Sequence, residues 1–138
     1  MKSVQVTVDV ALTKSEVVKL VWDPEVALRL VYLVEDLRKV GLTYRLNGKY
    51  EVRKAIWPDD KVVYTAFRDR KIDELIFDYR YASWDRSLVQ VTFSTNRFLV
   101  SKRLISSTVI SNAKLLFNGI YASKEVERAR RVLDFRIR

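Results

Sequence analysis

The sequence predicts one α+β domain, in which a curved antiparallel sheet of about six or seven strands wraps around a long C-terminal helix, with two short helices after the first strand. Three observations predict this class. Apolar and polar residues alternate at the start and through the middle of the chain, turn residues separate the middle segments, and the last third has a helical apolar spacing. The 138 residues, 49% of them hydrophobic, suffice for one core, so residues 1–138 are expected to form a single domain.

The N-terminal part predicts one strand followed by two helix starts. Residues 4–10 place a valine at every second position, the pattern of a strand with one buried face. Thr13 or Ser15 is the predicted N-cap of the first helix. Asp23 is the predicted N-cap of the second, because Pro24 follows it at the first helical position. The end of that helix stays open, since residues 26–34 are apolar nearly all round: the segment either stays helical to Lys39 or becomes a strand near Leu33.

The middle of the chain predicts a meander of antiparallel strands over residues 50–57, 61–69, 72–84 and 88–95. Asn47 and Gly48 predict a hairpin turn before it, because both residues tolerate a positive φ. Alternation assigns one apolar, aromatic face to Val63, Thr65, Phe67, Leu75, Phe77, Tyr79, Tyr81, Val89, Val91 and Phe93. The opposite face of the third of these strands is polar, which is typical of a sheet covered on one side only.

A helix over residues 97–133, opened by Thr95 or Asn96, is predicted to cover the apolar face. Its stripe consists of Phe98, Ile105, Val109, Ala113, Leu116 and Ile120. The helix is also rich in hydroxyl and amide groups, and Thr108 and Asn112 lie one turn apart beside the stripe. These polar groups either face water and bond back to the helix or line a partly polar cavity. Residues 124–138 are either the end of this helix or a separate basic tail.

The residue types that are missing exclude several kinds of chemistry. The chain has no Cys and no His, so it cannot form a Cys/His zinc site, a disulfide, or a Ser-His-Asp or Cys-His catalytic group. It also has no apolar segment of membrane-spanning length. A cytoplasmic location is therefore expected, and the wealth of Val, Arg and Glu is typical of a thermophile.

The order of these elements is similar to that of the START-like helix-grip superfamily, which includes polyketide cyclases, lipid-transfer proteins and pollen allergens. The resemblance rests on the strand at 4–10, on Ser15-Glu16-Val17-Val18 leading to Trp22-Asp23-Pro24-Glu25, on the strands up to Thr95 and on the helix from Arg97. It implies a hollow between sheet and helix that relatives use for lipids, steroids, polyketides, cofactors or hormones. It implies no fixed set of catalytic residues.

Charge suggests what such a hollow would hold. The net charge is +9, and residues 97–138 carry most of it, which favours anionic partners. We therefore expect a small-molecule binding protein for an amphipathic anionic ligand, such as coenzyme A, an acyl-CoA or a phospholipid-like molecule, with no required cofactor and no metal site. The expected ligand-binding residues are Phe67, Phe77, Tyr79, Tyr81, Phe93, Arg97, Lys102, Arg103, Thr108 and Asn112.

Two other functions stay open on the sequence. A cyclase or hydrolase would need a proton donor, for which Tyr79 and Tyr81 are candidates, and a base, for which Asp9, Glu51 and Asp73 are candidates. No spacing pairs them, so no catalytic residue is assigned. RNA or another single-stranded nucleic acid is the second alternative, because basic residues are mixed with aromatic ones. A homodimer formed through the apolar residues of the tail is compatible with each function.

Overall fold

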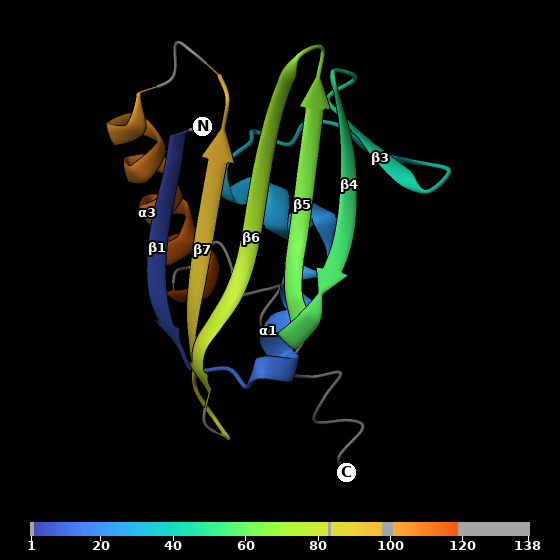
Figure 1. The fold of residues 1–138 in the computed structure, drawn as a ribbon. Helices are drawn as coiled ribbons and strands as arrows, with labels where there is room; N and C mark the ends of the chain where they lie inside the picture. Colours follow the sequence, from blue (N-terminus) through green and yellow to red (C-terminus); the bar gives the residue numbers. More distant parts are fainter. Residues whose placement is uncertain (1, 83, 98–100, 119–138) are drawn as a thin grey trace.

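A computed structural model describes residues 2–82, 84–97 and 101–118 of the chain, and for residues 81, 82 and 118 it describes only the backbone. Within these residues seven strands form one antiparallel sheet in the order β1-β7-β6-β5-β4-β3-β2 (Figure 1). The strands are β1 (Lys2–Val10), β2 (Leu37–Val40), β3 (Thr43–Leu46), β4 (Tyr50–Trp57), β5 (Lys61–Arg68), β6 (Lys71–Ala82) and β7 (Ser87–Thr95). The helices are α1 (Lys14–Val21), α2 (Pro24–Ala27) and α3 (Lys102–Asn118), and short 3-10 turns are η1 (Leu28–Leu30) and η2 (Pro58–Asp60).

The core lies on one face of the curved sheet, between the strands, α1, the α2–η1 segment and α3 (Figure 1). The predicted α3 stripe is confirmed at Ile105, Val109, Ala113 and Leu116, which are all buried in this core. Its other two predicted members, Phe98 and Ile120, lie outside the described residues. The predicted α+β class, with a curved antiparallel sheet and a C-terminal helix, is therefore confirmed. None of the helices in the described part of the chain combines the length and the apolar character needed to cross a membrane.

The two short helices start where their caps predict. Thr13 accepts a hydrogen bond from the Glu16 backbone N–H, and the Glu16 side chain accepts one from the Thr13 N–H, which forms a complete capping box. Asp23 caps α2 by accepting from the Glu25 N–H, with Pro24 in the first turn. The helical stretch ends early, at Leu30, because the chain then turns toward the β2–β3 hairpin.

The start of α3 differs from the prediction. The side chain of Ser101 accepts a hydrogen bond from the Leu104 N–H, and the helix begins at Lys102 rather than at residue 97. Thr95 and Asn96 do not cap it, since Thr95 ends β7 and the Asn96 side chain bonds to Ile72 and Arg70 at the neighbouring hairpin. Residues 119–133 of the predicted helix, and the predicted tail at 124–138, lie outside the described residues.

The face assigned to β5 was wrong by one residue. Tyr64 lies opposite Leu75 and Val62 opposite Phe77, so these side chains point into the core together. Phe67 lies opposite Ile72 and therefore shares the outer face of the sheet. Both faces of β5 carry apolar residues, and for that reason period-two alternation alone could not distinguish them.

Candidate functional site

A cavity of about 310 Å³ lies between the α2–η1 segment and α3. Its lining consists of Val26, Arg29, Leu30, Val31, Tyr32, Leu33, Thr108, Asn112, Leu115 and Leu116. The wall is mainly apolar, with a few polar groups from both sides, as in a site for a small organic molecule. Leu33 is 77% exposed and Leu115 is 45% exposed, so large apolar side chains of the lining are open to solvent.

One polar contact fixes the two walls of the cavity to each other. The Asn112 side-chain amide donates a hydrogen bond to the Leu30 carbonyl oxygen at 2.8 Å, and this bond joins α3 to η1. Arg29 stands on the η1 side, with its guanidinium 3.2 Å from the Glu25 carboxylate. Thr108 adds a hydroxyl one turn before Asn112. The cavity thus offers a cation, a hydroxyl and an amide beside an apolar wall.

A buried polar cluster lies behind Tyr32. The Tyr32 hydroxyl donates to the carboxylate of Asp73 at 2.5 Å, and the Thr95 hydroxyl donates to the other carboxylate oxygen, also at 2.5 Å. The Arg97 guanidinium pairs with the same carboxylate at 3.0 Å. Asp73 is only 2% exposed, so this carboxylate depends on these three partners in place of water.

Burial and the nearby Asp73 carboxylate raise the pKa of Tyr32 well above its usual value. The tyrosine therefore keeps its proton and acts as a hydrogen-bond donor to Asp73. Of the three carboxylates considered as bases, only Asp73 is buried. Asp9 pairs with Arg86 at 3.2 Å and Glu51 with Arg53 at 3.5 Å, and both pairs are well exposed to solvent.

The predicted sheet aromatics are not brought together at this cavity. Phe77 and Phe93 are 0% and 2% exposed and belong to the packed core. Phe67 lies on the outer face, 5.2 Å from the guanidinium of Arg53. Their predicted contact with a ligand gains no support from these positions.

Tyr79 is partly buried against another part of the core, and its ring centre is 5.4 Å from the Lys14 ammonium. Its hydroxyl is buried and has no hydrogen-bond partner among the described residues, and burial raises its pKa. Tyr81 belongs to β6, opposite Leu88, just after a register shift that interrupts the alternation. Its side chain lies outside the described residues.

The three cations among the predicted site residues, Arg97, Lys102 and Arg103, do not form one group. Arg97 is engaged by Asp73, while Lys102 and Arg103 lie exposed in the first turn of α3. Arg103 lines an open surface groove with Ser106, Ser107, Ile110, Ser111 and Lys114, on a different side of the helix from the cavity. Most of the helix hydroxyls thus face outward. Among the predicted site residues whose side chains the structure describes, Thr108 and Asn112 line the cavity, in agreement with one of the two interpretations of these groups.

Sequence reasoning missed the other wall. Arg29, Tyr32 and Leu33 were not among the predicted site residues, although the segment 26–34 is apolar nearly all round. That pattern is the available signal, because a short segment that is apolar on all sides must contact more than one neighbour.

No protein-family model and no curated protein matches this sequence. Solved structures do match its fold. A hypothetical protein from Sulfolobus tokodaii has a TM-score of 0.64 and 18% identity, over 93% of this chain and 98% of its own. A START superfamily protein from Mycobacterium smegmatis has a TM-score of 0.63 and 15% identity, over 91% and 97%. An aromatase/cyclase, Zhui, from a Streptomyces species has a TM-score of 0.57 and 16% identity, over 91% and 93%.

The chain therefore has the START-like helix-grip fold, as the order of elements predicted. At these identities the likeness establishes the fold and leaves the chemistry of the site to the residues themselves.

Proposed function

We propose that the protein binds a small amphipathic molecule whose apolar part occupies the cavity between η1 and α3. The observation that carries the proposal is the lining itself, which combines an apolar wall with Arg29, Thr108 and Asn112. The fold and the placement of Thr108 and Asn112 support it. The volume of about 310 Å³ is near the lower end for small-molecule sites, so an acyl chain or a ring fits better than an entire cofactor.

An acyl-CoA or a phospholipid-like molecule would meet these limits with its chain inside and its phosphorylated head outside. Arg29 is the cation of the lining, and its ion pair with Glu25 is exposed to solvent, whereas Arg97 is paired with the buried carboxylate of Asp73. We therefore place the anionic head near Arg29 rather than near Arg97. The net charge of +9 adds a general attraction for an anionic head. Coenzyme A without an acyl chain would bind weakly, since nothing would fill the apolar part.

Thermal unfolding with a series of acyl-CoAs, free coenzyme A and fatty acids tests this proposal. Ligands with an acyl chain should raise the melting temperature, because they bind the folded state. A free ligand concentration of about 100 times the Kd stabilises the folded state by about 2.7 kcal/mol. Thr108→Trp should abolish the shift by filling the cavity. Ser107→Trp should retain it, because Ser107 is exposed like Thr108 but lines the surface groove beside Arg103 and not the cavity.

Native mass spectrometry of the purified protein should show a retained small molecule in the wild type and none in Thr108→Trp. A wild type that responds to no acyl compound would overturn the proposal. If single-stranded RNA then stabilised the protein, with an effect that falls steeply as salt rises, the nucleic-acid function would replace it.

A reaction in the same cavity is the second candidate, and the pair of Tyr32 and Asp73 favours it. Tyr32 lines the cavity and holds its hydroxyl proton against a buried carboxylate, a combination that a hydrolase or cyclase can use for proton transfer. Thiol release from an acyl-CoA tests the hydrolase. Thiol release by the wild type that is lost in Tyr32→Phe would support a reaction. If the wild type leaves the thioester intact but still shows the thermal shift, the cavity binds the ligand without transforming it.

A further inference from the structure

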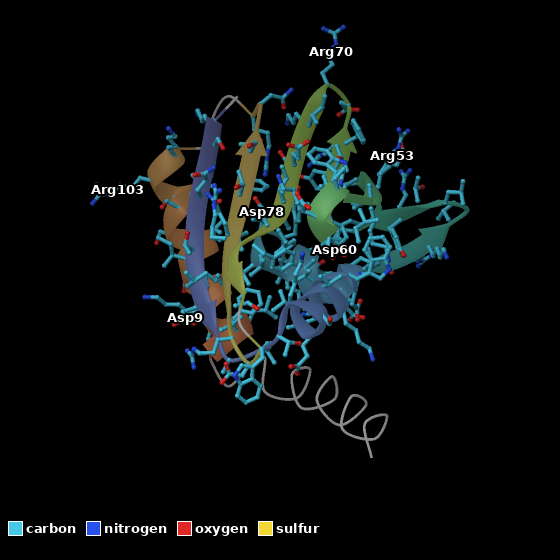
Figure 2. The ribbon with its side chains drawn as sticks, turned by 60° about the horizontal axis from the view of Figure 1, so that its bottom comes forward. Asp9, Arg53, Asp60, Arg70, Asp78 and Arg103 are labelled. Atoms are coloured by element: carbon cyan, nitrogen blue, oxygen red, sulfur yellow. The ribbon has the colours of Figure 1, made fainter. Side chains whose placement is uncertain are left out.

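The β2–β3 hairpin, residues 37–46, forms an arm that extends beyond the rest of the sheet. Only Tyr44, Arg45 and Leu46 of β3 pair with β4, so residues 40–43 continue past the last position that is paired with β4. Both views show the arm reaching away from the body of the molecule, on the side opposite α3 (Figures 1 and 2). The tip of the arm is thus free to contact a partner surface.

The tip carries apolar side chains where a soluble hairpin normally carries polar ones. Val40 and Thr43 are paired, which leaves Gly41 and Leu42 as the two turn residues. Gly41 supplies the positive φ, at 63°, that such a two-residue turn requires. Leu42 is 97% exposed and Val40 is 58% exposed, although polar residues are the usual choice in turns.

One face of the arm is cationic. Arg38 and Arg45 lie directly opposite each other, an arrangement of like charges that destabilises a strand pair. Arg53 of β4 shares their face, because Arg45 lies opposite Glu51 and Arg53 is two residues further along. Asp36 and Glu51 are the acids that contact these guanidinium groups, so cations outnumber acids here.

We propose that the arm docks on an anionic membrane surface, with Val40 and Leu42 at the boundary between headgroups and acyl chains and the arginines against lipid phosphates. Exposed apolar residues beside cations are the combination that binds such an interface. A nucleic acid would pair with the arginines but would gain nothing from an apolar tip. This inference does not require an occupied cavity, although the Asn47 amide, at the base of the arm, bonds to the Leu33 carbonyl of the cavity lining at 2.7 Å.

Co-sedimentation of the full chain with vesicles tests the proposal. The wild type should bind vesicles of phosphatidylcholine with phosphatidylglycerol and show little binding to phosphatidylcholine alone. Leu42→Ser should lower the partition coefficient about 10-fold. In the free protein Leu42 is exposed, and the variant loses the free energy that its burial in lipid would contribute to binding. Arg45→Gln should lower it about 5-fold through the lost attraction to anionic lipid. Circular dichroism should show both variants folded.

The matched controls are Leu104→Ser and Arg103→Gln, at exposed residues of α3. Figure 2 shows Arg103 on the side of the molecule opposite the arm. Both control variants should bind vesicles like the wild type. Equal losses in the α3 variants, or no preference for anionic vesicles, would overturn the proposal. Binding of single-stranded RNA that depends on Arg45 and not on Leu42 would also overturn it and would make the arm a nucleic-acid surface. Thr108→Trp should leave vesicle binding unchanged, which separates this result from the fate of the cavity ligand.

Discussion

The hydroxyl of Tyr32 donates a 2.5 Å hydrogen bond to the carboxylate of Asp73, a residue 41 positions further along the chain. Tyr32 follows η1 and lines the cavity, whereas Asp73 lies in β6 with its side chain buried in the sheet. Arg97, just after β7, pairs with the same carboxylate at 3.0 Å. The Asp73 carboxylate therefore connects one wall of the cavity to β6 and β7. We expect the contacts that it makes to contribute unequally to the free energy of unfolding.

Arg97→Met is expected to destabilise the fold by about 2–4 kcal/mol, because it leaves a buried carboxylate without its cation while Tyr32 and Thr95 still donate to it. Arg86→Met is the control, since its partner Asp9 is 3.2 Å away on an exposed part of the surface. An exposed pair of this kind contributes about 0–1 kcal/mol. Urea denaturation of both variants measures the difference, and equal losses would contradict the role given to the Asp73 cluster.

Alkaline pH is expected to destabilise the protein through its buried tyrosines. Burial raises the pKa of Tyr32, Tyr64 and Tyr79 above 10.0. Above pH 10 the unfolded chain therefore releases these protons while the folded chain keeps them. The stability is intact below pH 10 and falls as the pH rises further, by about 1.4 kcal/mol per pH unit for each such tyrosine.

Urea denaturation between about pH 9 and 11 measures this slope. Tyr64→Phe, which removes the hydroxyl that donates to the Val21 carbonyl, should reduce the slope by about one third relative to the wild type. Tyr44→Phe is the comparison variant, because Tyr44 is partly exposed in β3 whereas Tyr64 is 1% exposed. A slope that is the same in Tyr64→Phe and the wild type would show that Tyr64 ionises normally in the folded state.

Local signals in the sequence were sufficient for most of the fold. The capping residues Thr13 and Asp23 determine their helix starts through bonds to the next three residues, so they can be found without any tertiary information. The Asn47-Gly48 turn follows in the same way, because both residues have the positive φ that the hairpin needs. The face of β5 was not predictable, since Tyr64 and Phe67 are both aromatic and only pairing with β6 decides which is buried.

The site depended on such long-range pairing and was for that reason predicted only in part. Thr108 and Asn112 could be predicted because a helix that only covers a dry core favours apolar residues beside its stripe. Arg97 was expected to be available to a ligand, but the register of β6 against β7 puts Thr95 opposite Asp73 and brings Arg97 to the carboxylate. The local sequence does not specify this register, and the apolar pattern of residues 26–34 does not specify α3 as the neighbour of η1.

The bond between Asn112 and the Leu30 carbonyl is expected to hold the cavity closed at one side. Asn112→Ala should destabilise the protein by about 1–2 kcal/mol, because the partly buried carbonyl loses its donor. Ser111→Ala, at the adjacent exposed position, should change the stability by no more than about 0.5 kcal/mol. Chemical denaturation compares the two variants. A loss in Asn112→Ala no larger than that in Ser111→Ala would mean that water replaces the bond at little cost.

Asn47 is expected to act as a fastener of the cavity wall in addition to forming a turn. Its side-chain oxygen accepts from the backbone N–H groups of Glu35 and Asp36 at 2.8 and 2.9 Å, and its amide donates to the Leu33 carbonyl. Asn47→Gly keeps the positive φ of 53° but removes all of these bonds, whereas Asn47→Asp keeps the acceptor.

The Gly variant should therefore lose about 1–2 kcal/mol of stability and the Asp variant clearly less. Hydrogen exchange of the Glu35 and Asp36 amides gives a local measurement that global unfolding cannot. Exchange should accelerate in Asn47→Gly and stay slow in Asn47→Asp, because an aspartate oxygen still accepts both N–H groups. If both variants exchanged at the wild-type rate, the side chain of Asn47 would serve the turn alone, and the segment after η1 would owe its position to packing.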